Sequence, residues 1–87
     1  SQYISFEIDT SMLKDALSSS IYDDNIALFI NINSLDDIKD IFLYKEKLKE
    51  IFLTFELHLN SKDIFEAINQ LRVLQKNIDI PFYKLKE

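Results

Sequence analysis

One histidine and two glutamates are the residues of this chain whose types could support acid–base catalysis or metal binding. His58 is the only histidine, and Glu56 lies two residues before it. If this segment is a strand, alternation places both side chains on one sheet face, and Glu7 joins them if the first and third strands are neighbours. One imidazole and two carboxylates can bind zinc or transfer protons. A solvated sheet face with ordinary polar residues is the favoured interpretation, because nothing in the sequence defines their geometry and there is no second pair of ligands.

Other polar clusters fit loops better than sites. Serines 18–20 have no elbow motif and no base beside them. Asp23 and Asp24 are acidic, but a calcium loop needs more oxygen ligands and a central glycine. The chain contains no glycine at all, which excludes glycine-rich phosphate-binding loops. The sequence therefore predicts no catalytic residue, no metal ligand, no cofactor and no enzymatic activity.

Length and composition predict a single domain spanning residues 1–87. The chain is 47% hydrophobic and 13% aromatic, which is too apolar for a disordered protein. No apolar run approaches the roughly 18–20 residues of a membrane span. The first residues, SQYISFEID, lack the basic and apolar regions of a signal peptide. Because there is also no cysteine, a cytoplasmic protein without membrane contact is expected.

The negative charge of the chain is concentrated before residue 38. The net charge is −5, and residues 1–37 contain seven acidic residues against one lysine, which is −6. An acidic surface repels nucleic-acid phosphates and suits a basic protein partner. Acidic residues at the edge of a binding surface raise the rate at which a basic partner associates. An exposed aromatic residue then holds the bound partner. The predicted partner-binding residues are Tyr22, Asp23, Asp24, Asp36 and Asp37.

The pattern of apolar residues divides the first half of the chain into predicted strands and helices. Residues 3–8 alternate strictly and predict a strand, which a short helix at 10–18 follows. Residues 26–33 predict a second strand that is apolar on both sides at its start, as is typical of a central strand. Ser34 caps the next helix. The residues expected to face the core are Ile4, Phe6 and Ile8 in the first strand, Ile26, Leu28, Ile30 and Ile32 in the second, and Ile38, Ile41, Phe42 and Leu48 in the helix.

Residues 51–59, IFLTFELHL, are compatible with two structures. A strand places Ile51, Leu53, Phe55, Leu57 and Leu59 inward and leaves Phe52 unexplained. A continuing helix leaves two leucines on the wrong side, so the strand is favoured. The alternative is that the N-terminal strands are followed by a long helical hairpin.

The last helix is predicted at 61–77, where an apolar stripe includes Ile64, Ile68 and Leu71, flanked by Phe65. Pro81 ends helical structure nearby, so residues 78–86 are expected to be extended, as an edge strand.

The same short motif, Asn-Ser followed by an aspartate, occurs at residues 33–37 and 60–63. Such residues cap helices, so each copy of the motif marks the point where a strand ends and a helix begins. The motif occurs twice because the chain repeats a strand followed by a helix. The mostly one-sided strands favour a small two-layer sandwich of the α/β or α+β class. It has one sheet of three to four strands, with two to three helices on one face.

Three functions follow from this profile. The favoured one is a small acidic module that binds another protein, as inhibitors, antitoxins, immunity proteins and phage-encoded modulators do. The alternative is a structural or homo-oligomeric assembly protein, with a homo-dimer as one form. A small metal-dependent enzyme using His58 ranks third.

Overall fold

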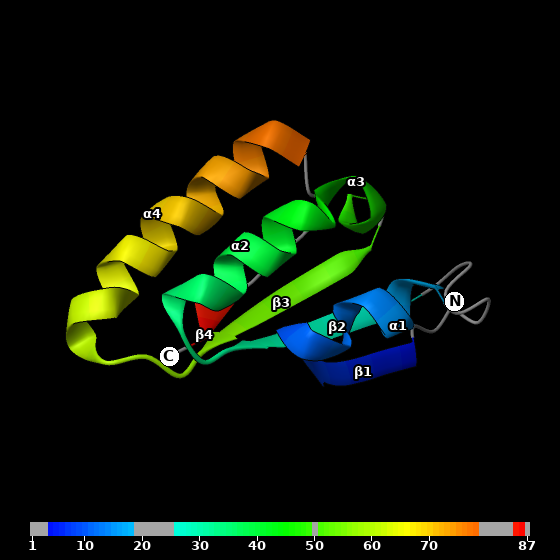
Figure 1. The fold of residues 1–87 in the computed structure, drawn as a ribbon, viewed down its shortest axis with the longest axis horizontal. Coiled ribbons are helices and arrows are strands. Elements are labelled where there is room, and N and C mark those ends of the chain that lie inside the picture. The colour runs from blue at the N-terminus through cyan, green and yellow to red at the C-terminus, as the bar shows by residue number, and fades with distance from the viewer. Residues whose placement is uncertain (1–3, 19–25, 50, 79–84, 87) are drawn as a thin grey trace.

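Four parallel strands form one sheet, and their order in the sheet is their order along the chain (Figure 1). The computed structural model describes residues 4–18, 26–49, 51–78 and 85–86. The strands are β1 (Ile4–Asp9), β2 (Ile26–Ile32), β3 (Phe52–Leu57) and β4 (Leu85–Lys86). The helical elements are η1 (Thr10–Met12), α1 (Leu13–Ser18), α2 (Leu35–Leu43), α3 (Lys45–Leu48) and α4 (Ser61–Ile78). The predicted two-layer α/β architecture is confirmed.

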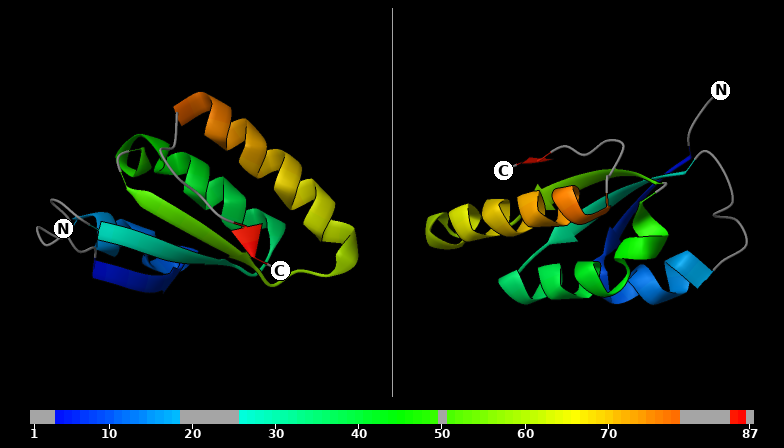
Figure 2. Two further views of the ribbon diagram at one scale, coloured as in Figure 1. Left: turned by 180° about the vertical axis from the view of Figure 1, so that it is seen from behind. Right: turned by 90° about the horizontal axis from the view of Figure 1, so that it is seen from above.

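The core lies on one face of the sheet. Alternate residues of the three long strands are buried together with the inner residues of the helices in one cluster. β1 forms one edge of the sheet and β4 the other, and α2 lies beside α4 (Figures 1 and 2). The fully buried strand residues are Leu28, Ile30, Ile32, Leu53 and Phe55, and the buried helix residues are Leu13, Ala16, Ile38, Ile41, Leu48, Ala67, Leu71 and Leu74.

Residues 52–57 form a strand, as the alternation predicted. β3 pairs with β2 along six consecutive residues, from Ala27 opposite Phe52 to Ile32 opposite Leu57. Leu53, Phe55 and Leu57 are buried, and Phe52 lies on the other face. The alternative of a long helical hairpin is wrong. Residues 52–57 form a strand because their backbone pairs with β2 and their alternate side chains are buried.

The helix expected after Ser34, with an apolar stripe that reaches Leu48, is broken in two at Tyr44. The backbone of Tyr44 has φ −106° and ψ 15°, and its N–H donates to the carbonyls of Ile41 and Phe42. An unbroken helix would place Lys45 on the stripe of Ile41 and Leu48, at spacings of four and three. We attribute the break to this placement of a lysine within an apolar stripe. The break lets Leu48 become fully buried while Lys45 keeps contact with water.

Both predicted helix caps are present. The Asp37 carboxylate accepts hydrogen bonds from the backbone N–H groups of Asn33 at 2.7 Å and Ser34 at 3.3 Å. Asn60 caps α4, since its side-chain oxygen accepts from the N–H of Asp63 at 2.9 Å. These bonds satisfy backbone donors that a helix end leaves free. The repeated Asn-Ser joints therefore act as helix caps in the structure.

Two apolar residues expected to contact the core lie outside it. Ile4 is 61% exposed because it begins the edge strand, and Phe65 is 74% exposed on α4, where Ala67, Leu71 and Leu74 form the buried stripe. The predicted helix at 61–77 is confirmed and extends to Ile78. β4 is an edge strand, and residues 79–84, including Pro81, lie outside the described residues. Within the described ranges, no helix has the length and apolarity needed to cross a membrane.

Replacing Asp37 with alanine removes the acceptor of two backbone N–H groups at the start of α2. We expect Asp37→Ala to lower the free energy of unfolding by about 1 kcal/mol, measured by urea denaturation followed by circular dichroism. Asp36→Ala is the matched control. Its ion pair with Lys39 at 3.3 Å is highly exposed, so its loss should cost less than about 0.5 kcal/mol. Equal losses for the two variants would contradict the capping role of Asp37.

Candidate functional site on the open sheet face

The face of the sheet opposite the helices is the candidate functional surface. Its residues alternate with the buried ones, and none of those that the structure describes is buried. They are Ser5, Glu7 and Asp9 on β1, Ala27, Phe29 and Asn31 on β2, and Phe52, Thr54 and Glu56 on β3. Phe29 keeps 39% of its surface exposed. All-parallel sheets are almost always covered on both faces, so this open face is unusual.

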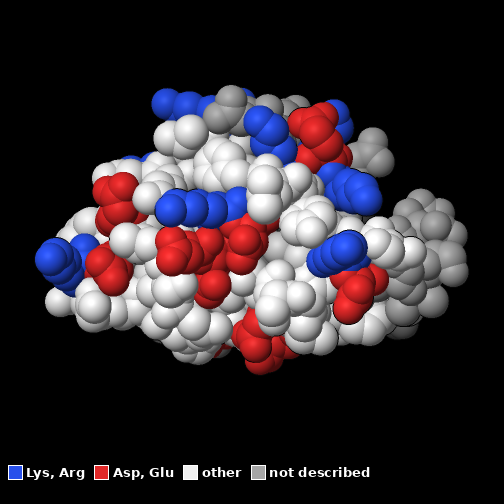
Figure 3. All heavy atoms as spheres, viewed as in Figure 1, with Lys and Arg blue, Asp and Glu red and all other residues white. Residues whose placement is uncertain are grey.

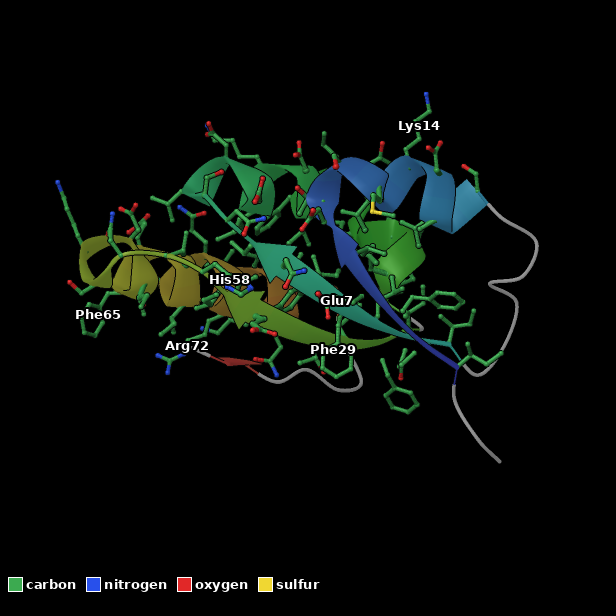
Figure 4. The ribbon with its side chains drawn as sticks, turned by 90° about the horizontal axis from the view of Figure 1, so that it is seen from below. Glu7, Lys14, Phe29, His58, Phe65 and Arg72 are labelled. Carbon is green, nitrogen blue, oxygen red and sulfur yellow. The ribbon has the colours of Figure 1, made fainter. Side chains whose placement is uncertain are left out.

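Four polar side chains lie in contact across this face, which we call the Asn31 network: Glu7, Asn31 and His58 are linked by hydrogen bonds, and Glu56 lies beside His58. The Asn31 amide nitrogen donates to Glu7 Oε2 at 3.2 Å, and Asn31 Oδ1 lies 3.0 Å from His58 Nε2. His58 Nε2 is 3.6 Å from Glu56 Oε1. Glu7, Phe29 and His58 lie over the sheet in Figure 4, whereas Lys14 points away on α1.

Parallel pairing is what brings these four residues together. The register sets Asp9, Asn31 and Glu56 side by side in one row and Glu7, Phe29 and Thr54 in the next. The His58 N–H donates to the Ile32 carbonyl at 2.9 Å, which extends the β2–β3 ladder beyond β3 and holds the imidazole beside Asn31. The predicted pair of Glu56 and His58 is present, but β1 and β3 are not neighbours, and Glu7 contacts Asn31 of the strand between them.

The direction of hydrogen bonding follows from the chemistry of the groups. An ionised glutamate only accepts, so the Asn31 amide nitrogen must point to Glu7 and its oxygen to His58. An amide oxygen also only accepts, so His58 Nε2 carries a proton. This assignment leaves His58 Nδ1 and the remaining carboxylate oxygens available to solvent or to a bound partner.

The side chains of the Asn31 network are accessible to water. The side chains of His58 and Glu56 keep 46% and 29% of their surface exposed, so water competes for every group in the network. Over the described part of the chain, no three His, Cys, Asp or Glu residues are grouped to hold a metal ion. What the face offers is a pair of carboxylates on either side of Asn31 and an exposed aromatic ring beside them.

The acidic residues predicted to bind a partner are only partly described. Asp36 and Asp37 lie in the first turn of α2, where acidic side chains gather (Figure 3). Asp37 is engaged in the cap described above, and Asn33 links it to Asp9, whose Oδ1 is 3.4 Å from the Asn33 amide nitrogen. Tyr22, Asp23 and Asp24 lie outside the described residues, so their part in a partner surface stays a prediction.

Two residues of this face were not recognised from the sequence. Asn31 is the centre of the network, and Phe29 is its aromatic neighbour. The alternation of residues 26–33 placed both on the outer face. What the sequence could not supply is the register that sets Asn31 between Asp9 and Glu56, because these pairing partners are 22 and 25 residues away.

The chain matches no protein-family model, no curated protein and no solved structure.

His58→Ala tests whether the imidazole does more than occupy this surface. We expect the free energy of unfolding to change by less than about 0.5 kcal/mol, because an exposed polar side chain with one neutral hydrogen bond contributes little. Urea denaturation measures the change, and Leu53→Ala in the core, with an expected loss of about 2–5 kcal/mol, sets the scale. A loss for His58→Ala that approaches the core value would show that the Asn31 network holds the sheet together.

Proposed function

We propose that this protein is a binding module whose open sheet face receives a basic segment of another protein. The observation that carries the proposal is that none of the described helices covers the outer face of an all-parallel sheet. Such faces are normally covered by helices. Here the outer face bears Phe29 and the Asn31 network. A partner that covers this face supplies the missing layer, and the module acts by binding rather than by catalysis.

Charge identifies the kind of partner. The outward positions of β1, β2 and β3 contain the carboxylates of Glu7, Asp9 and Glu56 and no lysine or arginine, while Lys86 of β4 lies beside Glu56 in the register. An arginine or lysine side chain laid across Phe29 places its charge near Glu7 and its alkyl stem on the ring. Contact with the ring face and with a carboxylate both favour a cation.

The acidic excess elsewhere in the chain supports the same partner. With a net charge of −5, the protein attracts basic surfaces over distances of about a Debye length, roughly 8–10 Å at moderate salt. Rim charges raise the rate of association, and the aromatic ring with its neighbouring carboxylates provides the contact itself. This division of roles suits a small cytoplasmic inhibitor or immunity-type protein, the class proposed here.

Neutralising the open face should weaken binding to the partner. We expect Glu7→Gln with Glu56→Gln to lower affinity about tenfold, a loss of about 1.4 kcal/mol, because two exposed charge pairs contribute up to about 1 kcal/mol each. Proteins from the source cells are captured on the immobilised chain, identified by mass spectrometry, purified and measured by titration calorimetry.

The matched control removes the same charge from the helical side. Glu46→Gln with Glu66→Gln alters two exposed glutamates on α3 and α4. Phe29→Ala is compared in the same way with Phe65→Ala, whose ring is 74% exposed on α4. A partner that loses affinity for the helical variants and keeps it for the open-face variants would refute the proposed surface.

The acidic residues before β2 test the steering role separately. We expect Asp23→Asn with Asp24→Asn to slow association with that partner at low ionic strength and to leave dissociation unchanged, because rim charges act at long range. Stopped-flow mixing at low and high salt measures both rates. If the variant associates as fast as the wild type and the rate does not depend on salt, these residues serve only solubility and the steering role is wrong.

A further inference from the structure

The outward side of α4 is a surface that neither the core nor the proposed function uses. Phe65 is 74% exposed there, and Asn69, Arg72 and Lys76 follow it along the helix, all of them exposed. A helix turns by about 100° per residue, so spacings of four, seven and eleven place these four side chains along one side. We call them the α4 stripe. Phe65 and Arg72 extend from the same side of α4 in Figure 4.

The α4 stripe has an aromatic ring at its N-terminal end and positive charge at its C-terminal end, where Arg72 and Lys76 lie. The acidic residues of this helix are off the stripe, because Glu66 is turned by roughly 100° and Asp63 by roughly 160° from Phe65. The exposed basic residues of α4 are Lys62, Arg72 and Lys76. This side of the helix is therefore basic.

The open face has the same order of aromatic and charged residues, with the opposite sign. Phe29 precedes Asn31 on β2, and three carboxylates surround Asn31. Glu7 accepts its hydrogen bond, and Asp9 and Glu56 lie on either side of it in the register. The described charged and titratable residues at this end of the face are Glu7, Asp9, Glu56, His58 and Lys86, and with the imidazole neutral their charge is negative.

We propose that the α4 stripe of one copy docks on the open face of a second copy, with the helix running in the same direction as the strands. Phe65 then packs against the ring of Phe29, and Arg72 reaches the carboxylates around Asn31. The opposite direction would set Phe65 among the carboxylates. Self-docking rests on the proposed function, because the open face is again the receiving surface, and it names a second copy of this chain as an occupant.

The dimensions of the two surfaces agree with this direction. Phe65 and Arg72 are seven residues apart, which is about 10 Å along a helix. Phe29 and Asn31 are about 7 Å apart along a strand. The flexible arginine side chain spans the difference.

A second copy is needed because α4 cannot serve its own sheet in this way. It packs on the core through Ala67, Leu71 and Leu74, so its stripe faces away from the core. Parallel sheets are normally covered by helices on both faces. The α4 helix of a second copy supplies such a helix, and its charge is complementary to that of the open face.

The first experiment measures the mass of the protein by light scattering at low salt over a range of concentrations. The wild-type mass should rise from 10.3 kDa in dilute solution to at least twice that value. Arg72→Glu with Lys76→Glu should stay at 10.3 kDa, because its stripe repels the open face. Lys14→Glu with Lys39→Glu, on α1 and α2, has the same net charge and should assemble like the wild type. A wild type that stays at 10.3 kDa at every concentration would overturn self-docking.

The second experiment exchanges the charges between the two surfaces. Glu7→Lys with Glu56→Lys should also remain monomeric, because its face and its stripe are both basic. Mixing this variant with Arg72→Glu, Lys76→Glu protein restores opposite charges, so the mixture should regain the wild-type mass. Such recovery requires that both variants are folded. A mixture that stays monomeric while circular dichroism shows both variants folded would contradict the pairing of these two surfaces.

Self-docking and the proposed function fail in different ways. A wild-type chain that remains monomeric, while a captured basic protein binds the open face, overturns self-docking alone. Assembly that depends on Arg72 and Glu56, with no basic protein captured from the source cells, upholds self-docking and overturns the proposed partner. Partner affinity is measured on dilute chain, where the open face is free of a second copy.

Discussion

The pairing of β2 with a parallel neighbour on each side is the interaction on which the other elements depend. Leu28, Ile30 and Ile32 of β2 have no exposed surface, and the inner residues of every long helix pack in the same cluster. Burying a side chain of this size contributes about 1.5–3 kcal/mol, whereas an exposed ion pair contributes at most about 1 kcal/mol. The core face therefore holds the fold, and the Asn31 network adds little to its stability.

The connectivity explains why one face stays open. Strand order follows chain order, and each connection passes over the sheet before the next parallel strand begins. Crossovers of this kind share one hand, so a sheet wound in a single direction gathers its helices on one side. There is no reversal of strand order, and hence no switch point at which a crevice for a small ligand forms. The outward residues of the three long strands stay at least partly exposed.

The sequence predicted those features that depend on local pattern, and it missed those that depend on register. Alternation identified the strands, including 52–57, and capping residues identified the starts of α2 and α4. The break at Tyr44 was missed because the apolar stripe continues through it to Leu48. Ile4 and Phe65 were assigned to the core because periodicity shows which residues share a face and does not show how far that face is covered. The network was only partly foreseen, since Asn31 joins residues that pairing brings together from three strands.

The central claim is that the outer face of the sheet is uncovered in the free protein. Because the chain has no tryptophan, Phe29→Trp introduces a single fluorescent reporter at the middle of that face. Quenching by acrylamide measures its exposure directly, and Phe55→Trp, at a side chain only 1% exposed, provides the buried reference. The account predicts that the indole at position 29, where Phe29 is 39% exposed, is quenched several times better than the reference. Quenching as weak as that of the buried reference would contradict it, because the face would then be covered within the folded chain.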